Sequence, residues 1–165
     1  MAVRPSLPVK RHPAFQDLSR DHFTALNRSL QVLRAVERHP AAMMTYPQAF
    51  AAFKALWNRD GLRAHFLEEE TDLVPVLRAR GAGELADRMM REHGDLRARF
   101  EALDVAQDQA VAATAQGLTA HARWEEDVVF EWLQANLPEE ELEALLRRSQ
   151  GFRAAHGLPV HPPKR

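Results

Sequence analysis

Two segments of the chain, residues 61–70 and 117–126, carry the same residue at six of their ten positions. The shared residues include a histidine with a glutamate four residues later, His65 with Glu69 and His121 with Glu125. On a helix, residues i and i+4 lie one above the other on the same face. Each segment therefore directs an imidazole and a carboxylate the same way, and two such faces turned toward each other could hold two metal ions.

Apolar residues recur at helical spacing along most of the chain and predict the helices that would carry these pairs. The pattern predicts helices over about 15–38, from Pro47 to just before Gly81 with a bend near Pro75, over 85–103, over 108–134, and over 139–148. Four long amphipathic helices with short connections indicate an all-α, up-and-down antiparallel four-helix bundle with a short C-terminal fifth helix. We divide the chain into an N-terminal arm (1–14), the bundle (15–136), and a short helix with a C-terminal tail (137–165).

Each long helix carries one histidine on its inward apolar stripe, and two of them add a glutamate. A single histidine on such a stripe is more often a core residue than a metal ligand. Six polar groups at one depth are a different case, because a buried ionised carboxylate costs several kcal/mol unless it is paired or bound to metal. The candidate metal ligands are His22, His65, Glu69, His93, His121 and Glu125. Hydrogen-bonded His–Glu pairs without metal remain the alternative.

Several neighbouring residues leave details open. Glu126 follows Glu125, so the ligand on the last long helix is uncertain by one position. Gly61 and Gly117 each precede a candidate ligand by one turn, which fits either close helix packing or space for a small ligand. The remaining histidines lie in predicted loops or tail, where we expect them to be solvated: His12, His39, His156 and His161.

Composition narrows the metal and excludes other functions. The chain has no cysteine, which excludes disulfides, thiolate metal sites and thiol catalysis, whereas imidazole and carboxylate suit iron, manganese or zinc. Helices of ferritin-like di-iron proteins carry Glu-x-x-His, and the His-x-x-x-Glu spacing here argues against that class. With 22 basic and 23 acidic residues and no apolar run of membrane-spanning length, we expect a cytoplasmic protein without nucleic-acid or membrane partners.

The ordered set His22, His65 to Glu69, Glu92-His93 and His121 to Glu125 resembles the hemerythrin-like, or HHE cation-binding, domain over about residues 18–135. The resemblance implies a four-helix bundle enclosing a non-haem di-iron centre. It also implies that Glu69 and Glu125 bridge the irons beneath a bridging oxygen, with the histidines as terminal ligands. Oxygen carriers of the family have a histidine four residues before the equivalent of His93, where this chain has Met89, and place the last carboxylate at the equivalent of Glu126.

These features together predict a di-iron protein that binds or senses a small diatomic ligand, dioxygen or nitric oxide, or that handles iron. An oxidase or peroxidase-like enzyme using the same two ions is one alternative. A metal-free helical interaction module is the other. The sequence contains no residue-level argument for a protein partner or for a homo-oligomer.

Overall fold

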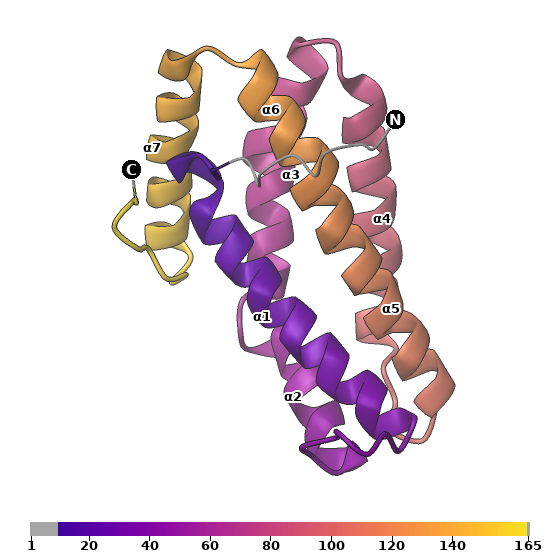
Figure 1. The fold of residues 1–165 in the computed structure, drawn as a ribbon. Helices are drawn as coiled ribbons and strands as arrows, with labels where there is room; N and C mark the ends of the chain where they lie inside the picture. The colour runs from indigo at the N-terminus through magenta and orange to yellow at the C-terminus, as the bar shows by residue number, and fades with distance from the viewer. Residues whose placement is uncertain (1–9, 165) are drawn as a thin grey trace, which may run out of the picture.

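Helices account for most of residues 10–164, the part of the chain that the computed structural model describes (Figure 1). No strand occurs within these residues, so the all-α prediction is confirmed. None of their helices is both long enough and apolar enough to cross a membrane. The elements are α1 (Pro13–Val36), α2 (Tyr46–Asn58), α3 (Leu62–Ala79), α4 (Gly83–Glu101), α5 (Asp108–Trp124), a π-helical turn η1 (Glu125–Val129), α6 (Phe130–Asn136) and α7 (Glu139–Ala155).

The first helices begin where local chemistry favours a helix start. Pro13 opens α1, and Nδ1 of His12 accepts a hydrogen bond from the backbone N–H of Ala14 at 3.1 Å. Proline also lies in the first turn of α2, where a glutamine side chain accepts from the backbone N–H of Thr45. Residues 1–9 of the predicted N-terminal arm lie outside the described residues, and α1 starts two residues before the predicted bundle boundary.

The predicted second helix is two helices, and Gly61 is the reason. This glycine precedes α3 with a φ of +95°, a left-handed conformation that residues with a Cβ rarely adopt. The break separates α2 from α3, while α3 continues through Pro75 to Ala79. The sequence pattern placed Gly61 inside one continuous helix, and that prediction was wrong. Since the two helices have separate axes, α3 can orient His65 and Glu69 independently of how α2 packs.

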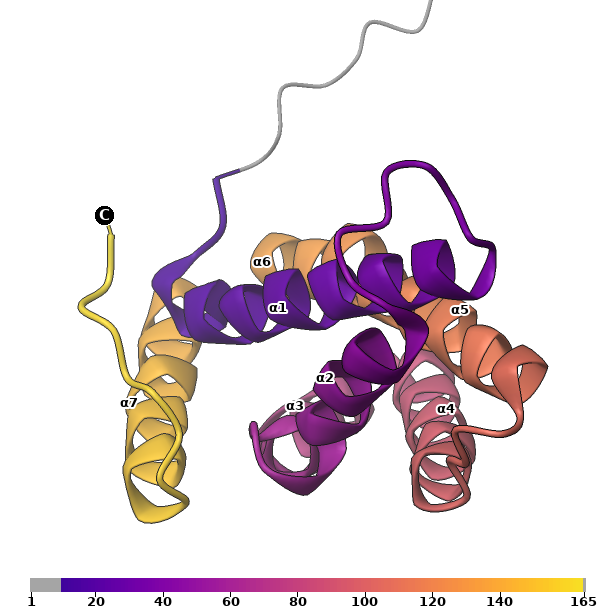
Figure 2. The ribbon, with the colours of Figure 1, turned by 90° about the horizontal axis from the view of Figure 1, so that it is seen from below.

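The helices enclose two apolar clusters with a polar layer between them. In both views α3 and α4 lie side by side, α1 lies across α5, and α2 continues α3 toward one end of the molecule (Figures 1 and 2). Along α1 the polar layer separates Leu18 of one cluster from Ala25 of the other. Along α4 it separates Met89 from Leu96 in the same way. The polar layer therefore falls in the middle of the helical stack.

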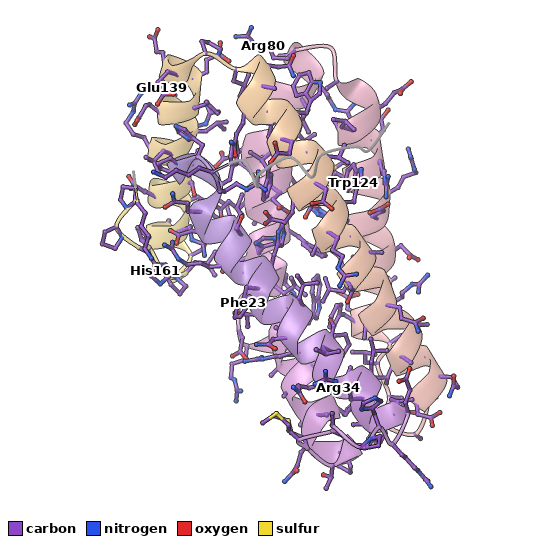
Figure 3. All side chains as sticks on the ribbon, viewed as in Figure 1. Phe23, Arg34, Arg80, Trp124, Glu139 and His161 are labelled. Atoms are coloured by element: carbon purple, nitrogen blue, oxygen red, sulfur yellow. The ribbon has the colours of Figure 1, made fainter. Side chains whose placement is uncertain are left out.

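The C-terminal helix is longer than predicted. The expected short helix ended at residue 148, whereas α7 runs to Ala155 and packs against α1 and α3. Its second half is anchored by the buried side chains of Ser149 and Arg153, a polar pair that apolar periodicity does not detect. The tail beyond α7 returns to α1, where His161 hydrogen-bonds Asp17 at 2.6 Å (Figure 3).

Replacing Gly61 with alanine should destabilise the protein by about 1–3 kcal/mol. The new Cβ would sit in a positive-φ conformation and lie 2.7 Å from Cδ2 of Leu158. Gly151→Ala is the matched control, because Gly151 lies within α7 with nothing within 4 Å of the added Cβ and should gain roughly 0.5–1 kcal/mol. Urea unfolding of both variants measures the difference. Equal stability of the two would show that the left-handed junction imposes no constraint.

Candidate metal centre

All six predicted ligands lie in the polar layer. Each of these residues is at most 3% exposed. They belong to five consecutive or neighbouring elements: His22 (α1), His65 and Glu69 (α3), His93 (α4), His121 (α5) and Glu125 (η1). Below, these six are called the centre, and Glu69 and Glu125 are its inner glutamates. Such a concentration of buried ionisable groups requires a compensating partner.

The centre divides into two overlapping groups of four. One ligand atom each from His22, His65 and the two inner glutamates lie within 4.8 Å of one another. The same holds for His93, His121 and the same two glutamates. Each group offers two imidazole nitrogens and two carboxylate oxygens, and the two groups share both carboxylates.

The inner glutamates present different oxygens to the two groups. Oε1 of Glu69 lies 3.3 Å from Nε2 of His65, and its Oε2 lies 3.3 Å from Nε2 of His93. Oε2 of Glu125 lies 3.1 Å from Nε2 of His22, whereas its Oε1 lies 3.0 Å from Nε2 of His121. Each carboxylate therefore spans from one histidine pair to the other, which is the orientation of a bridging ligand.

Unsatisfied atoms provide the test of whether these residues fit a cation. Both oxygens of each inner glutamate are buried without a hydrogen-bond partner, as are Nε2 of His93 and of His121. Nε2 of His22 and Nε2 of His65 face each other at 3.1 Å. When both rings are neutral with Nδ1 protonated, two lone pairs meet there, an unfavourable contact that a bound cation would relieve. The residues present therefore fit a metal centre of nitrogen and oxygen ligands.

A second set of carboxylates fixes the histidines from outside. Nδ1 of each histidine donates to one carboxylate at 2.7–3.0 Å, and we call these groups the outer carboxylates: Asp21 to His65, Glu70 to His93, Glu92 to His121 and Glu126 to His22. Because an ionised carboxylate can only accept, the neutral ring carries its proton on Nδ1 and turns the Nε2 lone pair toward the centre. This carboxylate–histidine arrangement is the usual support of metal-bound imidazoles.

Each outer carboxylate also contacts an arginine. The pairs differ in how much water reaches the arginine side chain, which is 1% exposed for Arg153, 19% for Arg11, 38% for Arg97 and 44% for Arg88. Arg153 contacts Asp21 at 3.0 Å, and Arg11 contacts Glu126 at 2.9 Å. Arg97 contacts Glu70 at 3.1 Å, and Arg88 contacts Glu92 at 2.6 Å. The positive charges favour the ionised carboxylates that the histidines require.

Sequence reasoning missed these outer groups, although a signal for them exists. Every outer carboxylate is adjacent in sequence to one of the six centre residues, as Asp21 is to His22 and Glu70 is to Glu69. Neighbouring residues on a helix are rotated by about 100°. A residue next to an inward ligand therefore points along the seam toward the adjacent helix, where it reaches that helix's histidine.

The π-helical turn bears on the choice between Glu125 and Glu126. In η1 the backbone N–H of Phe130 bonds to the carbonyl of Glu125, which widens the turn. Such turns occur often at functional sites. Glu125 is fully buried among the imidazoles, while Glu126 bonds Nδ1 of His22 and the guanidinium of Arg11. The geometry thus gives Glu125 the inner position and Glu126 the outer one.

Charge pairing controls protonation in the metal-free centre. Burial opposes protonation of His22, but the nearby carboxylate of Glu125 and the hydrogen bond to Glu126 prevail and raise its pKa to about 9. The pKa of His93 rises to about 11 for the same reason, with Glu125, Glu69 and Glu70 as partners. Burial would raise the pKa of Glu125, yet the charge of His121 and the close approach of three histidine nitrogens hold it well below its usual range. Metal binding therefore displaces protons from the imidazoles.

Aromatic and apolar side chains enclose the histidines. The ring of Phe66 stacks on His93 with centroids 4.0 Å apart, and Phe130 stacks on His22 at 5.6 Å. Met89, which replaces the extra histidine of oxygen carriers, is fully buried in an apolar cluster. The four rings are thus held by packing as well as by hydrogen bonds.

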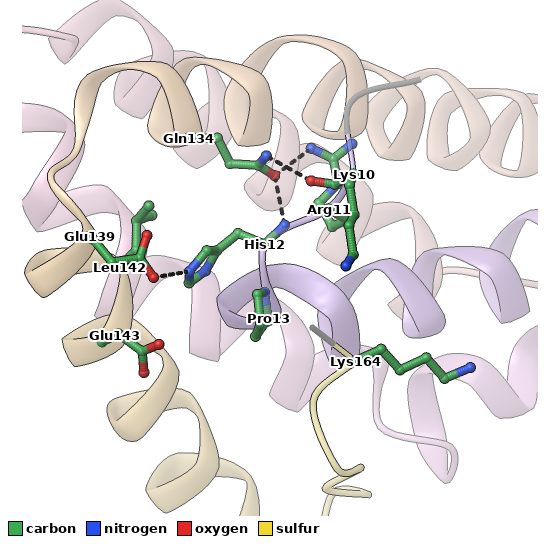
Figure 4. Close-up of a pocket in the computed structure, with 9 residues that line it drawn as sticks. All are labelled: Lys10, Arg11, His12, Pro13, Gln134, Glu139, Leu142, Glu143 and Lys164. Carbon is green, nitrogen blue, oxygen red and sulfur yellow. Dashed lines mark hydrogen bonds and ion pairs between the residues drawn. The ribbon is translucent and has the colours of Figure 1, made fainter. Parts of the chain in front are cut away.

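A third cluster of possible ligands, His12 with Glu139 and Glu143, does not fit a metal (Figure 4). Nδ1 of His12 accepts the helix-capping bond from Ala14, so the proton of the neutral ring is on Nε2, which donates to Glu139 at 3.2 Å. No lone pair is left for a cation. His12 is half-buried rather than solvated as expected, whereas His39, His156 and His161 are exposed.

Comparison with known proteins gives one result. A family model described as the hemerythrin HHE cation-binding domain matches residues 14–133. Searches of curated proteins and of solved structures returned no match. The match includes all six residues of the centre and ends before α7.

The metal-free protein should lose stability as the pH rises. A histidine whose folded-state pKa lies above its ordinary value stabilises the fold below about pH 6.5, and this contribution is lost as the pH rises through the folded pKa. For His22 that value is about 9, so the melting temperature in chelator should fall by about 5 °C or more between about pH 6.5 and 9.5. Thermal unfolding followed by circular dichroism measures it. An unchanged melting temperature would mean that the imidazoles are neutral without metal.

Proposed function

The chain belongs to the hemerythrin HHE cation-binding domain family, and from this premise we propose that the centre holds two iron ions. His22 and His65 would hold one ion and His93 and His121 the other, with the inner glutamates bridging them. The helices that carry these residues would form the family's up-and-down four-helix bundle, α1, α2 with α3, α4, and α5 with α6. The C-terminal helix α7 is then an addition to that bundle.

One observation carries this proposal. Each inner glutamate turns one oxygen to the His22/His65 pair and the other to the His93/His121 pair, at 3.0–3.3 Å from Nε2 of one histidine in each pair. Two isolated His–Glu pairs would not require either carboxylate to reach both sides. A site for two cations does require it, which favours the metal centre over a metal-free interaction module.

The donor set suits iron and leaves room for a ligand. Imidazole and carboxylate without thiolate suit iron, and the protein supplies four donor atoms to each ion when both carboxylates bridge. Octahedral coordination would leave further positions for water or a small molecule. Bound iron supplies electron transfer and reversible coordination of a diatomic molecule, so we propose that the protein binds or senses dioxygen or nitric oxide.

The chain's own residues would tune that chemistry. Phe66 stacks on His93 and Phe130 on His22, so apolar rings rather than polar groups cover these imidazoles. The outer carboxylates keep the Nδ1 proton of each histidine in place and increase the basicity of the Nε2 donor. Met89 lies in an apolar cluster, so each ion would be held by two histidines and the two halves would offer equal numbers of protein ligands.

Protein produced in iron-rich medium should contain close to two irons per chain and absorb in the near-ultraviolet by ligand-to-iron charge transfer. Addition of nitric oxide to the reduced protein should change that spectrum. His65→Ala and His121→Ala should each lower the iron content. A metal-free wild-type protein, or one in which these variants change neither iron nor spectrum, would contradict the proposal. Oxygen consumption with turnover would instead indicate an oxidase.

The two adjacent glutamates should respond differently to the same substitution. Glu125→Gln removes a charge shared by both ions, so iron should fall below one per chain. Glu126→Gln removes the charge that pairs with Nδ1 of His22 and with Arg11 but leaves the inner glutamates, and it should retain iron with affinity weakened about 10–100-fold. Metal analysis after equilibration with a chelator of known affinity distinguishes them. The reverse order of effects would assign the inner position to Glu126.

A further inference from the structure

The C-terminal helix reaches the centre although it lies outside the region that matches the family. Residues 14–133 match, whereas Arg153 belongs to α7 and is 1% exposed. Both terminal nitrogens of its guanidinium contact Asp21, at 3.0 and 3.1 Å. In Figures 1 and 2, α7 lies at one side of the molecule next to α1, which carries Asp21.

Asp21 transmits this contact to a predicted metal ligand. Its Oδ2 accepts from Nδ1 of His65 at 3.0 Å, and Nε2 of the same ring faces the centre. A guanidinium, a carboxylate and an imidazole thus form one connected line from α7 to the centre.

The guanidinium of Arg153 has further hydrogen-bond partners besides Asp21. NH1 also contacts Oε2 of the buried Glu68 at 2.8 Å, and Ser149 donates to the other oxygen of Glu68. Nε donates to the backbone carbonyl of Pro159 in the C-terminal tail at 2.8 Å. A desolvated, bidentate guanidinium fixes a carboxylate in both position and orientation.

The arginines that contact the outer carboxylates of the His93/His121 half make fewer contacts and are more exposed than Arg153. Arg97 contacts Glu70 with one nitrogen, and Arg88 contacts Glu92 through Nε. Their side chains are 38% and 44% exposed, so water screens these pairs and substitutes for them when they are lost. The His93/His121 half therefore depends less on its arginines than His65 depends on Arg153.

We propose that Arg153 is a positioning residue that acts through Asp21 to orient His65, so that the ion of the His22/His65 half depends on α7. This inference rests on the proposed function. It assigns a role in metal binding to a helix outside the family domain. It also predicts that α7 affects the binding of the ion in the His22/His65 half more than the binding of the other ion.

The test is the rate at which the iron-loaded protein releases iron to excess chelator. Arg153→Gln alone would leave Glu68 as an unpaired buried charge and endanger folding. The test variant is therefore the double variant Arg153→Gln/Glu68→Gln, and Glu68→Gln, which keeps the Arg153–Asp21 contact, is its reference. Arg97→Gln is the matched control in the other half. Circular dichroism checks that every variant is folded before the measurement.

We expect the double variant to release one of its two irons at least about 10-fold faster than Glu68→Gln, while the second iron leaves at the wild-type rate. Arg97→Gln should change release by less than about threefold. Asp21→Ala should reproduce the fast phase. Adding Arg153→Gln/Glu68→Gln to Asp21→Ala should accelerate release no further, since both act through the same contact.

Three results would overturn the inference. Equal release from the double variant and Glu68→Gln would leave the proposed di-iron centre standing and remove the role of Arg153. Faster loss of both irons, additive with Asp21→Ala, would indicate general loosening of the fold. A wild-type protein that takes up no iron would overturn the proposed function and this inference together.

Discussion

Two buried carboxylates among four imidazoles are the interaction on which the rest of the structure depends. Glu69 and Glu125 are fully buried and lie near each other, and histidine nitrogens approach their oxygens to 3.0–3.3 Å. Leaving such charges uncompensated in an apolar interior costs several kcal/mol, so the surrounding helices must bring compensating groups to one depth. The apolar clusters above and below the layer hold the helices at that depth, and the aromatic rings against His22 and His93 keep water from substituting for the imidazoles.

Helix rotation is constrained more tightly by the outer carboxylates than by apolar packing. Apolar side chains tolerate small rotations of a helix about its axis because dispersion contacts are many and weakly directional. A hydrogen bond of 2.7–3.0 Å between Nδ1 and a carboxylate does not. α1, α3, α4 and the continuous segment of α5 and η1 each supply a histidine to the centre and a carboxylate to a neighbour. Rotating α4, for example, would misplace His93 and release His121 from Glu92.

Much of this arrangement could be predicted from the sequence because two of its residue pairs have the same spacing within a helix. Four-residue spacing between His65 and Glu69, and again between His121 and Glu125, depends only on helix geometry, and the structure brings these residues together with His22 and His93. The break at Gly61 was missed because apolar spacing continues across it, and only the positive φ reveals it. The length of α7 and the role of Arg153 were missed because a buried guanidinium has its partners, Asp21 and Glu68, more than 80 residues away in the sequence. The spacing of neighbouring residues in the sequence does not predict contacts between residues so far apart.

The four contacts between histidines and outer carboxylates join α1 to α3, α3 to α4, α4 to α5, and η1 back to α1. These contacts form a closed ring, because the last of them joins η1, near the end of the domain, to α1 at its beginning. The ends of the described chain are also near each other, because Lys10 and Lys164 border the same surface hollow (Figure 4). A circularly permuted chain, joined there and opened in the connection between α4 and α5, would retain every one of these links. The order in which the helices are synthesised is therefore separable from the geometry of the centre.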